Sequence, residues 1–215
     1  ASRGGAIYNR GSENGTASTS IVNVTFTGNS ASTEGGAIYN EQGTGTASLS
    51  ITNTILWGNT ASEGGDEISN SFGSASLAHT IVEGGVNGSG LGGDGTYTDA
   101  GGNLDQNPTF VEPGDPDGPD DIPATIDDGL SVKPGSPAFD AGDNTALDTT
   151  GNGTADITTD ITGATRAQDH GSGTAVVNIG AYETVPTGAP VAETDEAQNV
   201  TGTSAEVVGS ASAAG

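Results

Sequence analysis

The sequence predicts an all-β solenoid, a fold in which short strands stack coil upon coil. The hexamer GGAIYN occurs at Gly4–Asn9 and again at Gly35–Asn40, and a second phrase recurs after a shift of 30 residues. The 215 residues include 37 Gly but only one Trp, with no Cys and no Met. A helix-rich core is hard to build from this composition, whereas a solenoid satisfies most of its backbone with few large side chains.

The second phrase defines the length of the repeat. It reads TASTSIVNVTFTGNSAS at Thr16–Ser32 and TASLSITNTILWGNTAS at Thr46–Ser62, without a gap. A third pass, SASLAHTIVEGG at Ser74–Gly85, keeps the pattern with two residues deleted, and an altered copy of the hexamer, the seven residues GGDEISN, occupies Gly64–Asn70. Three consecutive copies indicate a stacked architecture in which each unit covers the apolar face of its neighbour.

Each unit is expected to form strands. Ser20–Phe26 and Ser50–Trp57 are rich in β-branched residues and are bounded by Gly-Asn corners. Residues at equivalent positions should stack from coil to coil, as interior columns where they are apolar and as hydrogen-bonded ladders where they are amides. The predicted columns are Ile21/Ile51 and Phe26/Leu56/Val82, and the predicted ladders are Asn29/Asn59 and Asn9/Asn40/Asn70.

The charge is strongly acidic, with 28 Asp and Glu against four Lys and Arg, a net charge of −24. Nucleic acid and anionic membrane surfaces would be repelled, and no stretch is apolar enough for membrane insertion. Two explanations of the acidity remain open. A hydrated carboxylate surface typical of halophilic proteins is favoured, and local calcium sites are the alternative. The absence of Cys excludes a disulfide framework.

Two resemblances arise from these phrases. GGAIYN together with FTGN at Phe26–Asn29 resembles the GGA-[IVL] and FxxN repeats of polymorphic outer-membrane adhesins, although Leu56 replaces Phe in the second unit. Four further phrases, in this order, resemble the choice-of-anchor domain of bacterial surface proteins over roughly residues 1–184. They are TILWGN (54–59), NPTFVEP (107–113), KPGSPAFDAGDNTA (133–146) and VNIGAYE (177–183). The resemblance implies a right-handed parallel β-helix, pectin-lyase-like, on a secreted, cell-anchored protein, and it implies no known activity.

The predicted organisation has four parts. Residues 1–90 form coils of about 30 residues, and residues 91–184 form a loop-rich continuation and β cap. Residues 86–107, which span the boundary between these two parts, should be a Gly-rich loop leaving the helix, and later short strands should cover the end of the helix, since an open coil exposes strand edges. Residues 185–190 are a linker, and residues 191–215 are an extended, incomplete fibronectin-III/Ig-like segment. Because residue 1 falls inside a repeat, the chain is expected to be a fragment of a larger parent.

Calcium is the candidate cofactor. Asp148, Asn152 and Asp156 surround a Gly-containing turn, as the ligands of small calcium loops do, although the alternating Asp and closing Glu of an EF-hand are missing. A second acidic cluster contains Asp115 and Asp117. Solvated acidic loops are the competing interpretation of both groups, and it is the favoured one.

Candidate catalytic groups are few, so no enzyme activity is expected. The adjacent acids Asp66 and Glu67 replace the Ala-Ile of the sister unit, but neighbouring strand residues point to opposite faces, so they should not act as a pair. A modified terminal rung is the favoured interpretation. His79 lies where its sister is Asn53 and is expected to be structural, and His170 lies in a loop without a clear geometry.

Three aromatic residues are candidate ligand-binding groups. Tyr8 and Tyr39 occupy equivalent positions and should stack in a ladder, and Trp57 belongs to the second unit. Facing outward, the ladder would offer a platform for sugar rings; facing inward, it would be core. The sequence leaves both orientations open.

The predicted function is that of a non-catalytic extracellular surface protein, a structural or adhesive rod. Its expected partners are further copies of itself or cell-surface and extracellular polysaccharides. Self-association is expected through end-to-end stacking or through strand addition by Val200–Ser212, with Val200, Val207 and Val208 as candidate contacts. Folding of that segment back on its own chain would contradict strand addition. A carbohydrate-binding or polysaccharide-degrading β-helix domain is the alternative.

Overall fold

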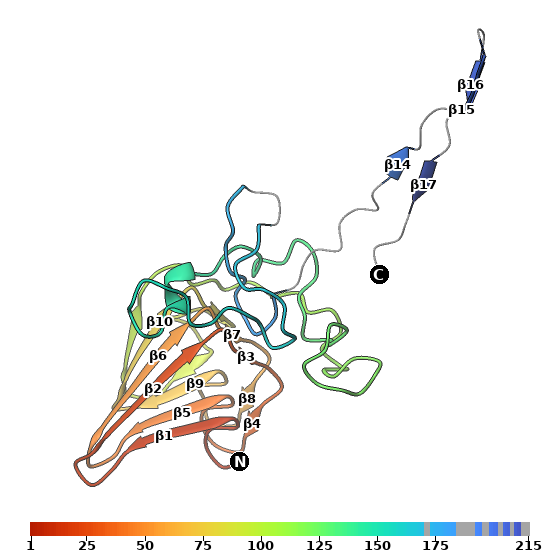
Figure 1. The fold of residues 1–215 in the computed structure, drawn as a ribbon. Helices are drawn as coiled ribbons and strands as arrows, with labels where there is room; N and C mark the ends of the chain where they lie inside the picture. The colour runs from red at the N-terminus through yellow and green to blue at the C-terminus, as the bar shows by residue number, and fades with distance from the viewer. Residues whose placement is uncertain (170–172, 184–191, 195–197, 202–203, 207–208, 212–215) are drawn as a thin grey trace. The chain divides into compact units, whose positions relative to one another are not determined.

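A computed structural model describes residues 1–169, 173–183, 192–194, 198–201, 204–206 and 209–211. The chain divides into two compact units, Ala1–Thr184 and Val185–Gly215, which are considered separately. The first unit contains a stack of coils and a largely irregular segment that packs against them (Figure 1). No helix within the described residues has the length and apolar character needed to cross a membrane.

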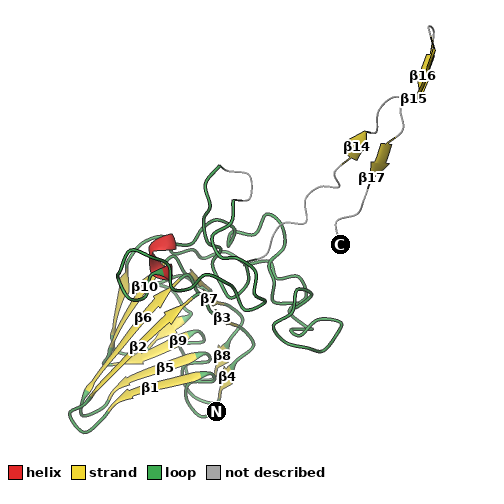
Figure 2. Ribbon diagram, viewed as in Figure 1, coloured by secondary structure: helices red, strands yellow, loops and turns green. Residues whose placement is uncertain are grey.

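The first unit confirms a parallel β-helix (Figure 2). Successive coils contribute one strand each to parallel sheets, in the orders β1-β5-β9-β12, β13-β10-β6-β2, β11-β7-β3 and β4-β8. The first two coils contain β1 (Ile7–Gly11), β2 (Thr16–Val22), β3 (Thr25–Phe26), β4 (Ser30–Ala31), β5 (Ile38–Gln42), β6 (Thr46–Thr52), β7 (Ile55–Leu56) and β8 (Thr60–Ala61). The next two contain β9 (Ile68–Ser71), β10 (Ser74–Ala78), β11 (Ile81–Val82), β12 (Leu91–Gly92) and β13 (Thr96–Asp99).

The predicted interior columns are confirmed. Ile21 pairs with Ile51, which pairs with Leu77, and all three are buried in one apolar cluster. Phe26, Leu56 and Val82 form the second column of the same cluster. Because the coils stack with identical side-chain positions in register, each interior residue packs against its counterpart above and below.

Both predicted asparagine ladders are also confirmed. Asn9 Nδ2 donates to Asn40 Oδ1 at 2.7 Å, and Asn40 Nδ2 donates to Asn70 Oδ1 at 2.8 Å. At the other corner, Asn29 Nδ2 donates to Asn59 Oδ1 at 2.9 Å. The amides can stack in this way because each carries both donors and an acceptor. They satisfy one another inside the turns, where all of them except the half-buried Asn29 are buried.

The third coil has a different register from the one predicted. Ser74 pairs with Ser48, so the strand β10 is aligned without a deletion up to His79. The shortening lies instead in the preceding turn, where Phe72 and Gly73 alone separate β9 from β10. A turn can lose residues at small cost, whereas the loss of two adjacent residues inside the strand would remove one side chain from the interior column and one from the outer face.

The prediction that residues 86–107 leave the helix as a loop is wrong. They form a fourth, shorter coil, in which β12 pairs with β9, β13 pairs with β10, and Leu104 forms a bridge to Ile81. The Gly-rich composition hid this coil because few of its residues carry apolar side chains. Gly93 has a φ of +88° and a Cβ there would lie 2.4 Å from the carbonyl oxygen of Asn70, so glycine is required for the tight turn.

The cap covers a side of the helix rather than the end that was predicted. Ile55 and Ile81 point outward from β7 and β11, opposite to the interior residues beside them. They are buried in a second apolar cluster with residues that the cap supplies, chiefly Phe110, Val132, Ala138 and Ile179. Within residues 105–183 the structure has isolated bridges and the short 3-10 helix η1 (Asn144–Leu147) in place of the short strands expected there.

Buried polar contacts hold the end of the cap. Arg166 Nη1 lies 3.3 Å from Glu183 Oε2, with side-chain exposures of 3% and 0%, and also donates to the carbonyl of Gly180 at 3.1 Å. Glu183 N donates to Asp160 Oδ2 at 2.7 Å, and the hydroxyl of Tyr182 donates to Asp128 Oδ2 at 2.6 Å. The last residues of the VNIGAYE phrase therefore bind the cap to itself.

The second unit contains antiparallel pairs. β14 (Ala192–Thr194) pairs with β17 (Gly209–Ala211), and β15 (Gln198–Thr201) pairs with β16 (Ser204–Glu206). The segment Val200–Ser212 thus folds back on its own chain wherever it is described, which contradicts the prediction of strand addition. Val200 belongs to one of these pairs, whereas Val207, Val208 and the predicted linker lie outside the described residues.

Candidate functional site

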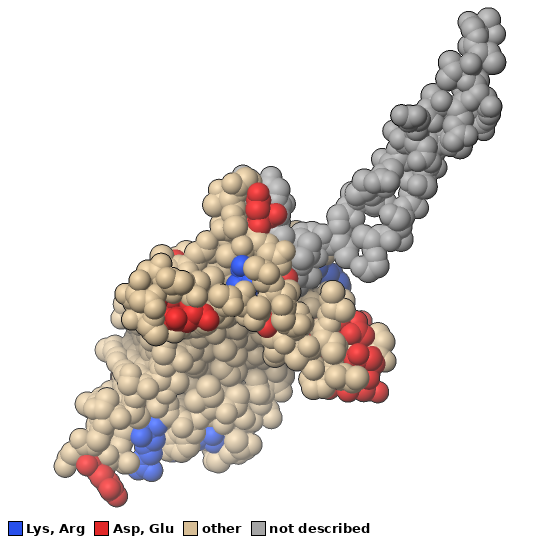
Figure 3. Space-filling view, viewed as in Figure 1, with Lys and Arg blue, Asp and Glu red and all other residues tan. Residues whose placement is uncertain are grey.

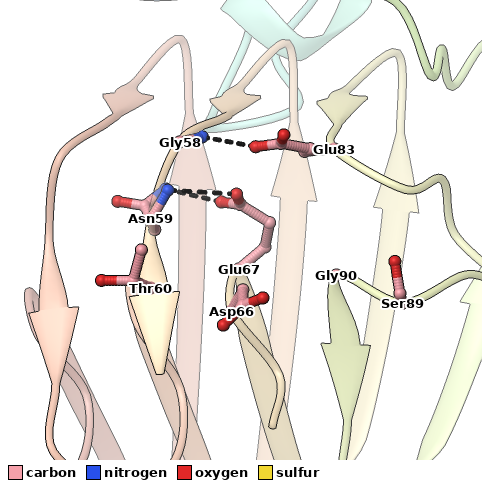
Figure 4. Close-up of a pocket in the computed structure, with 8 residues that line it drawn as sticks. All are labelled: Gly58, Asn59, Thr60, Asp66, Glu67, Glu83, Ser89 and Gly90. Carbon is pink, nitrogen blue, oxygen red and sulfur yellow. Dashed lines mark hydrogen bonds between the residues drawn. The ribbon is translucent and has the colours of Figure 1, made fainter. Parts of the chain in front are cut away.

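A notch opens on the side of the helix where the third coil is shorter than the second. Eleven residues connect β7 to β9, but eight connect β11 to β12, and among the described strands β8 pairs with β4 alone. The notch is a cavity of about 320 Å³ (Figure 4). Its lining consists of Gly58, Asn59, Thr60, Asp66, Glu67, Glu83, Ser89 and Gly90.

Three carboxylates in the notch accept hydrogen bonds from the backbone edge that the short coil leaves uncovered. Gly58 N donates to Glu83 Oε2 at 2.7 Å, Asn59 N donates to Glu67 Oε1 at 3.3 Å, and Ala61 N donates to Asp66 Oδ1 at 2.7 Å. One coil earlier, the equivalent amide of Gly28 donates to the backbone carbonyl of Gly58. The carboxylates therefore take the place of the backbone carbonyls that a full-length third coil would supply. They cap a sheet edge that would otherwise be open.

Glu67 also ends the asparagine ladder. Asn59 Nδ2 donates to Glu67 Oε2 at 2.5 Å, in the direction in which Asn29 donates to Asn59. Strand pairing aligns Asp66 and Glu67 with Gly36 and Ala37, so the expected alignment with Ala-Ile is wrong by one residue. Asp66 is exposed and Glu67 is completely buried, but both precede β9 and both line the notch, so the alternation of faces expected for adjacent strand residues does not apply to them.

The pKa of Glu67 is raised to about 7, chiefly by burial and also by the nearby charges of Glu83 and Asp66, whereas the hydrogen bonds from Asn59 oppose the shift. A carboxyl group with a pKa near 7 is in the range used by general acids. Both oxygens of Glu67 accept from Asn59, however, and the side chain has no exposed surface. This geometry favours a structural role, the modified rung that the sequence indicated.

Glu83, the third carboxylate of the notch, was not among the site residues predicted from the sequence. The alignment of the repeats does indicate where the asparagine ladder ends. Val82 pairs with Leu56, which places Gly85 where the second coil has Asn59. The loss of a third asparagine marks the end of the ladder, and the carboxylates nearest that gap are the groups that can replace its acceptor.

The candidate aromatic residues do not form a common platform. Tyr8 and Tyr39 face outward in register, with ring centroids 5.3 Å apart and planes at 70°, but their exposed fractions are 49% and 3%. The hydroxyl of Tyr8 donates to Glu41 Oε2, and this hydrogen bond raises the pKa of Tyr8. The guanidinium carbon of Arg3 lies 5.0 Å from the ring centroid of Tyr39. Trp57 packs instead against the cluster beneath the cap, so Tyr8 alone presents an open ring among the three candidates.

The candidate calcium ligands lie in exposed loops of the cap. Asp148 accepts backbone hydrogen bonds from Gly151, Asn152 and Gly153, and the bond from Gly153 contributes most to lowering its pKa. Asp156 accepts from Thr149 and Thr150, and its pKa is also lowered, chiefly by the hydroxyl of Thr149. Asp115 and Asp117 are exposed in a separate loop. Across the described part of the chain, no three Asp, Glu or His side chains gather in a group that could hold a metal ion.

His79 occupies a corner of the third coil. Its φ is +45°, and the equivalent residues Asn23 and Asn53 have φ values of +56° and +50°. Its Nδ1 lies 3.0 Å from the carbonyl oxygen of Ala141, so the side chain connects the corner to the cap. This contact fits the structural role expected from the sequence. His170 lies outside the described residues.

A comparison with family models finds one short match. Residues 23–41 match the Chlamydia polymorphic membrane protein repeat. The matched residues include Phe26, Asn29 and the second GGAIYN hexamer, which are the residues that build an interior column and both asparagine ladders. No curated protein and no solved structure matches the chain. The similarity therefore concerns a single coil of the helix.

Proposed function

We propose that this chain is the β-helix domain of a non-catalytic, extracellular surface protein that acts as a structural or adhesive rod. The observation that carries the proposal is the match between residues 23–41 and a repeat named for a membrane protein. The match falls on the residues that make one coil stack on the next. The resemblance therefore includes the side chains that stabilise the stack.

A flat, uncharged sheet face supports an adhesive or self-associating role. Two rows of hydroxyl side chains lie in register across strands β2, β6, β10 and β13. They are Ser18/Ser48/Ser74/Thr96 and Ser20/Ser50/Ser76/Thr98. They are exposed or half-buried. Fifteen of the 28 acidic residues lie instead between residues 105 and 183. In Figure 3 the visible surface of the coils is largely free of charge, while acidic groups gather on loops.

Co-sedimentation tests this proposal. The purified chain is centrifuged alone and with neutral and acidic polysaccharides, at low and at molar salt. A Ser50→Lys variant places a charge on the hydroxyl face without touching the interior, and Ser12→Lys, in the exposed β1–β2 turn, is the matched control. We expect pelleting that Ser50→Lys weakens and Ser12→Lys leaves unchanged. A chain that stays soluble under every condition would contradict both adhesion and self-assembly.

Salt dependence belongs to the same proposal. A net charge of −24 destabilises a compact chain by self-repulsion, and dissolved salt screens that repulsion. A protein adapted to concentrated salt should keep its fold and its pelleting behaviour at molar salt, and the molar-salt arm of the experiment examines this directly.

Carbohydrate binding is the second candidate function, favoured by one observation. Tyr8 exposes about half of its surface at the outer edge of the first coil, beside the carboxylate of Glu41 that holds its hydroxyl. An aromatic ring next to a hydrogen-bonding carboxylate is a suitable contact for a single sugar ring. Loss of polysaccharide pelleting in Tyr8→Ala, with the self-pelleting unchanged, would favour this candidate over the rod.

A further inference from the structure

The chain contains five Asn-X-Ser/Thr tripeptides, the acceptor sequence for N-linked glycans, and the structure separates them by accessibility. We infer that Asn14, Asn87 and Asn152 are acceptor sites for N-linked oligosaccharides, whereas Asn23 is not one in the folded chain. The fifth tripeptide begins at Asn199 in β15, where only the backbone is described. The inference rests on the proposed extracellular location, because N-glycans are added to exported chains.

Asn14 lies in the exposed turn between β1 and β2. Glu13 and Asn14 have φ values of +51° and +62°, and Gly15 N donates to the carbonyl of Ser12 at 2.8 Å. Both central residues of the turn thus have positive φ, as in the type I′ turns of tight hairpins, and Gly15 is its fourth residue. All four residues of the turn are exposed, so the amide of Asn14 points into solvent at the margin of the helix.

Asn87 lies in the connection between β11 and β12. Gly88 N donates to the carbonyl of Gly85 at 3.1 Å, which makes Asn87 the third residue of a turn, and both Asn87 and the acceptor-sequence hydroxyl residue Ser89 are exposed. A Cβ at residue 88 would lie 1.5 Å from the carbonyl oxygen of Gly84, so glycine is required at the middle position.

Asn152 lies in an exposed loop of the cap. Its Oδ1 accepts a hydrogen bond from Thr154 N at 2.8 Å, so the tripeptide already adopts the compact Asx turn in which the amide and the hydroxyl residue are close together. Asn152, Gly153 and Thr154 are all exposed. Nδ2 is therefore available to a transferring enzyme without unfolding of the loop.

Asn23 supplies the contrast within the same molecule. Its exposed fraction is 7%, and its side-chain oxygen and nitrogen are both buried at a corner of the first coil. The hydroxyl of Thr25, the third residue of this tripeptide, accepts a hydrogen bond from Ala181 N of the cap. Modification of Asn23 would require the corner to open and the cap to separate from it.

The reaction is a glycosyl transfer from a lipid-pyrophosphate-linked oligosaccharide. The bond between Asn Nδ2 and C1 of the first sugar forms, and the bond between C1 and the pyrophosphate oxygen breaks. One proton leaves Nδ2, and the lipid pyrophosphate departs as the leaving group. No oxidant or reductant takes part.

The test presents the folded 215-residue chain to a purified single-subunit oligosaccharyltransferase with its lipid-linked donor, and glycopeptides are quantified by mass spectrometry. Four synthetic peptides spanning Asn14, Asn23, Asn87 and Asn152 measure the reactivity of each tripeptide without the fold. Thr16→Ala, Ser89→Ala and Thr154→Ala remove the required hydroxyl and are the matched controls. Intact glycopeptides are counted because Asn-Gly sequences also lose ammonia spontaneously, which would imitate enzymatic glycan release.

We expect the three exposed sites of the folded chain to react as readily as their peptides. We expect Asn23 in the folded chain to react at least tenfold less than its own peptide. Reaction of the peptides without reaction of Asn14, Asn87 and Asn152 in the folded chain would overturn the inference, as would equal reaction at Asn23. The reaction uses purified chain, so its result is independent of whether the surface-protein proposal holds.

Discussion

The coils and the cap of this protein are stabilised by opposite means. In the coils the same residue types recur in register, so that each asparagine of a ladder bonds the next and each interior residue packs on its counterpart. In the cap the contacts occur once, and the Arg166–Glu183 pair has no counterpart in a neighbouring coil. The coils are therefore held by contacts that repeat, whereas the polar contacts of the cap each occur once.

The backbone of the cap follows the same pattern. Lacking ladders of strands, it satisfies its amides with side-chain carboxylates, and Asp160 accepts from Thr162 N, Ala164 N and Glu183 N. One substitution can thus release several backbone groups together.

Arg166→Ala should have the largest effect. The variant leaves the carboxylate of Glu183 buried without its cation and removes two hydrogen bonds to backbone carbonyls. Loss of one partner of a buried ion pair costs about 3–5 kcal/mol. Urea unfolding should show a reduced free energy of unfolding, and limited proteolysis should cut within residues 105–183 first.

Arg3→Ala is the matched control, because it removes an ion pair of similar length, 3.2 Å to Glu34, at an exposed site. Exposed pairs contribute about 0–1 kcal/mol. Equal destabilisation by the two variants, or cleavage that begins in the coils, would contradict the view that the cap depends on its buried pair.

Asn40→Ala measures how much the asparagine ladder contributes to the stability of the coils. Asn40 is fully buried in the middle of its ladder, and the variant leaves groups of Asn9 and Asn70 without their partner. Buried polar groups left unsatisfied cost about 1–3 kcal/mol each, so we expect a loss of about 2–4 kcal/mol. The control Ser50→Ala changes an exposed residue of the same coil and should stay within about 0.5 kcal/mol.

A mild effect of Asn40→Ala, no larger than that of Ser50→Ala, would mean that the interior columns alone hold the coils in register. Thermal and urea unfolding of the two variants, measured side by side at one salt concentration, distinguish these outcomes.

Glu67→Gln should change the pH dependence of stability. Because the folded chain raises the pKa of Glu67 from 4.5 to about 7, it binds this proton more tightly than the unfolded chain does. The resulting stabilisation is complete below pH 4.5 and is lost as the pH rises to about 7, a change of about 3 kcal/mol. Gln keeps an acceptor for Asn59 and carries no proton to lose, so the variant should lack this decline.

The measurement is urea unfolding of both chains between pH 5 and pH 8. Glu13→Gln, in the exposed β1–β2 turn, is the control and should retain the decline of the original chain. Parallel pH profiles for the original chain and Glu67→Gln would mean that the notch does not perturb this carboxyl group.

The smallest effect is expected from calcium. The oxygens of Asp148 already accept three backbone amides, and the described residues contain no cluster of three metal-binding side chains. We expect millimolar Ca²⁺ to leave the unfolding midpoint unchanged, measured against Mg²⁺ at the same ionic strength. A rise specific to Ca²⁺ that Asp148→Ala abolishes would support the calcium site considered from the sequence.

The contacts that stabilise the coils could be predicted from the sequence, because they are repeated. A ladder of similar residues gives a periodic pattern in the sequence. Spacing alone therefore predicted the columns Ile21/Ile51 and Phe26/Leu56/Val82 and both asparagine ladders. The same reasoning failed at the fourth coil, where glycine holds the backbone in its turn and leaves no apolar pattern. It also misplaced the deletion in the third coil, since spacing does not show whether a turn or a strand is shortened.

The contact partners in the cap and in the notch became known only from the tertiary structure. Arg166 and Glu183 are 17 residues apart, and Tyr182 and Asp128 are 54 apart, and no repeat relates either pair. Glu67, Asp66 and Glu83 meet because one coil is shorter than its neighbour, and each carboxylate binds a backbone amide that the missing residues would have covered. A contact that occurs once has no periodicity, so its partners are known only when the chain is folded.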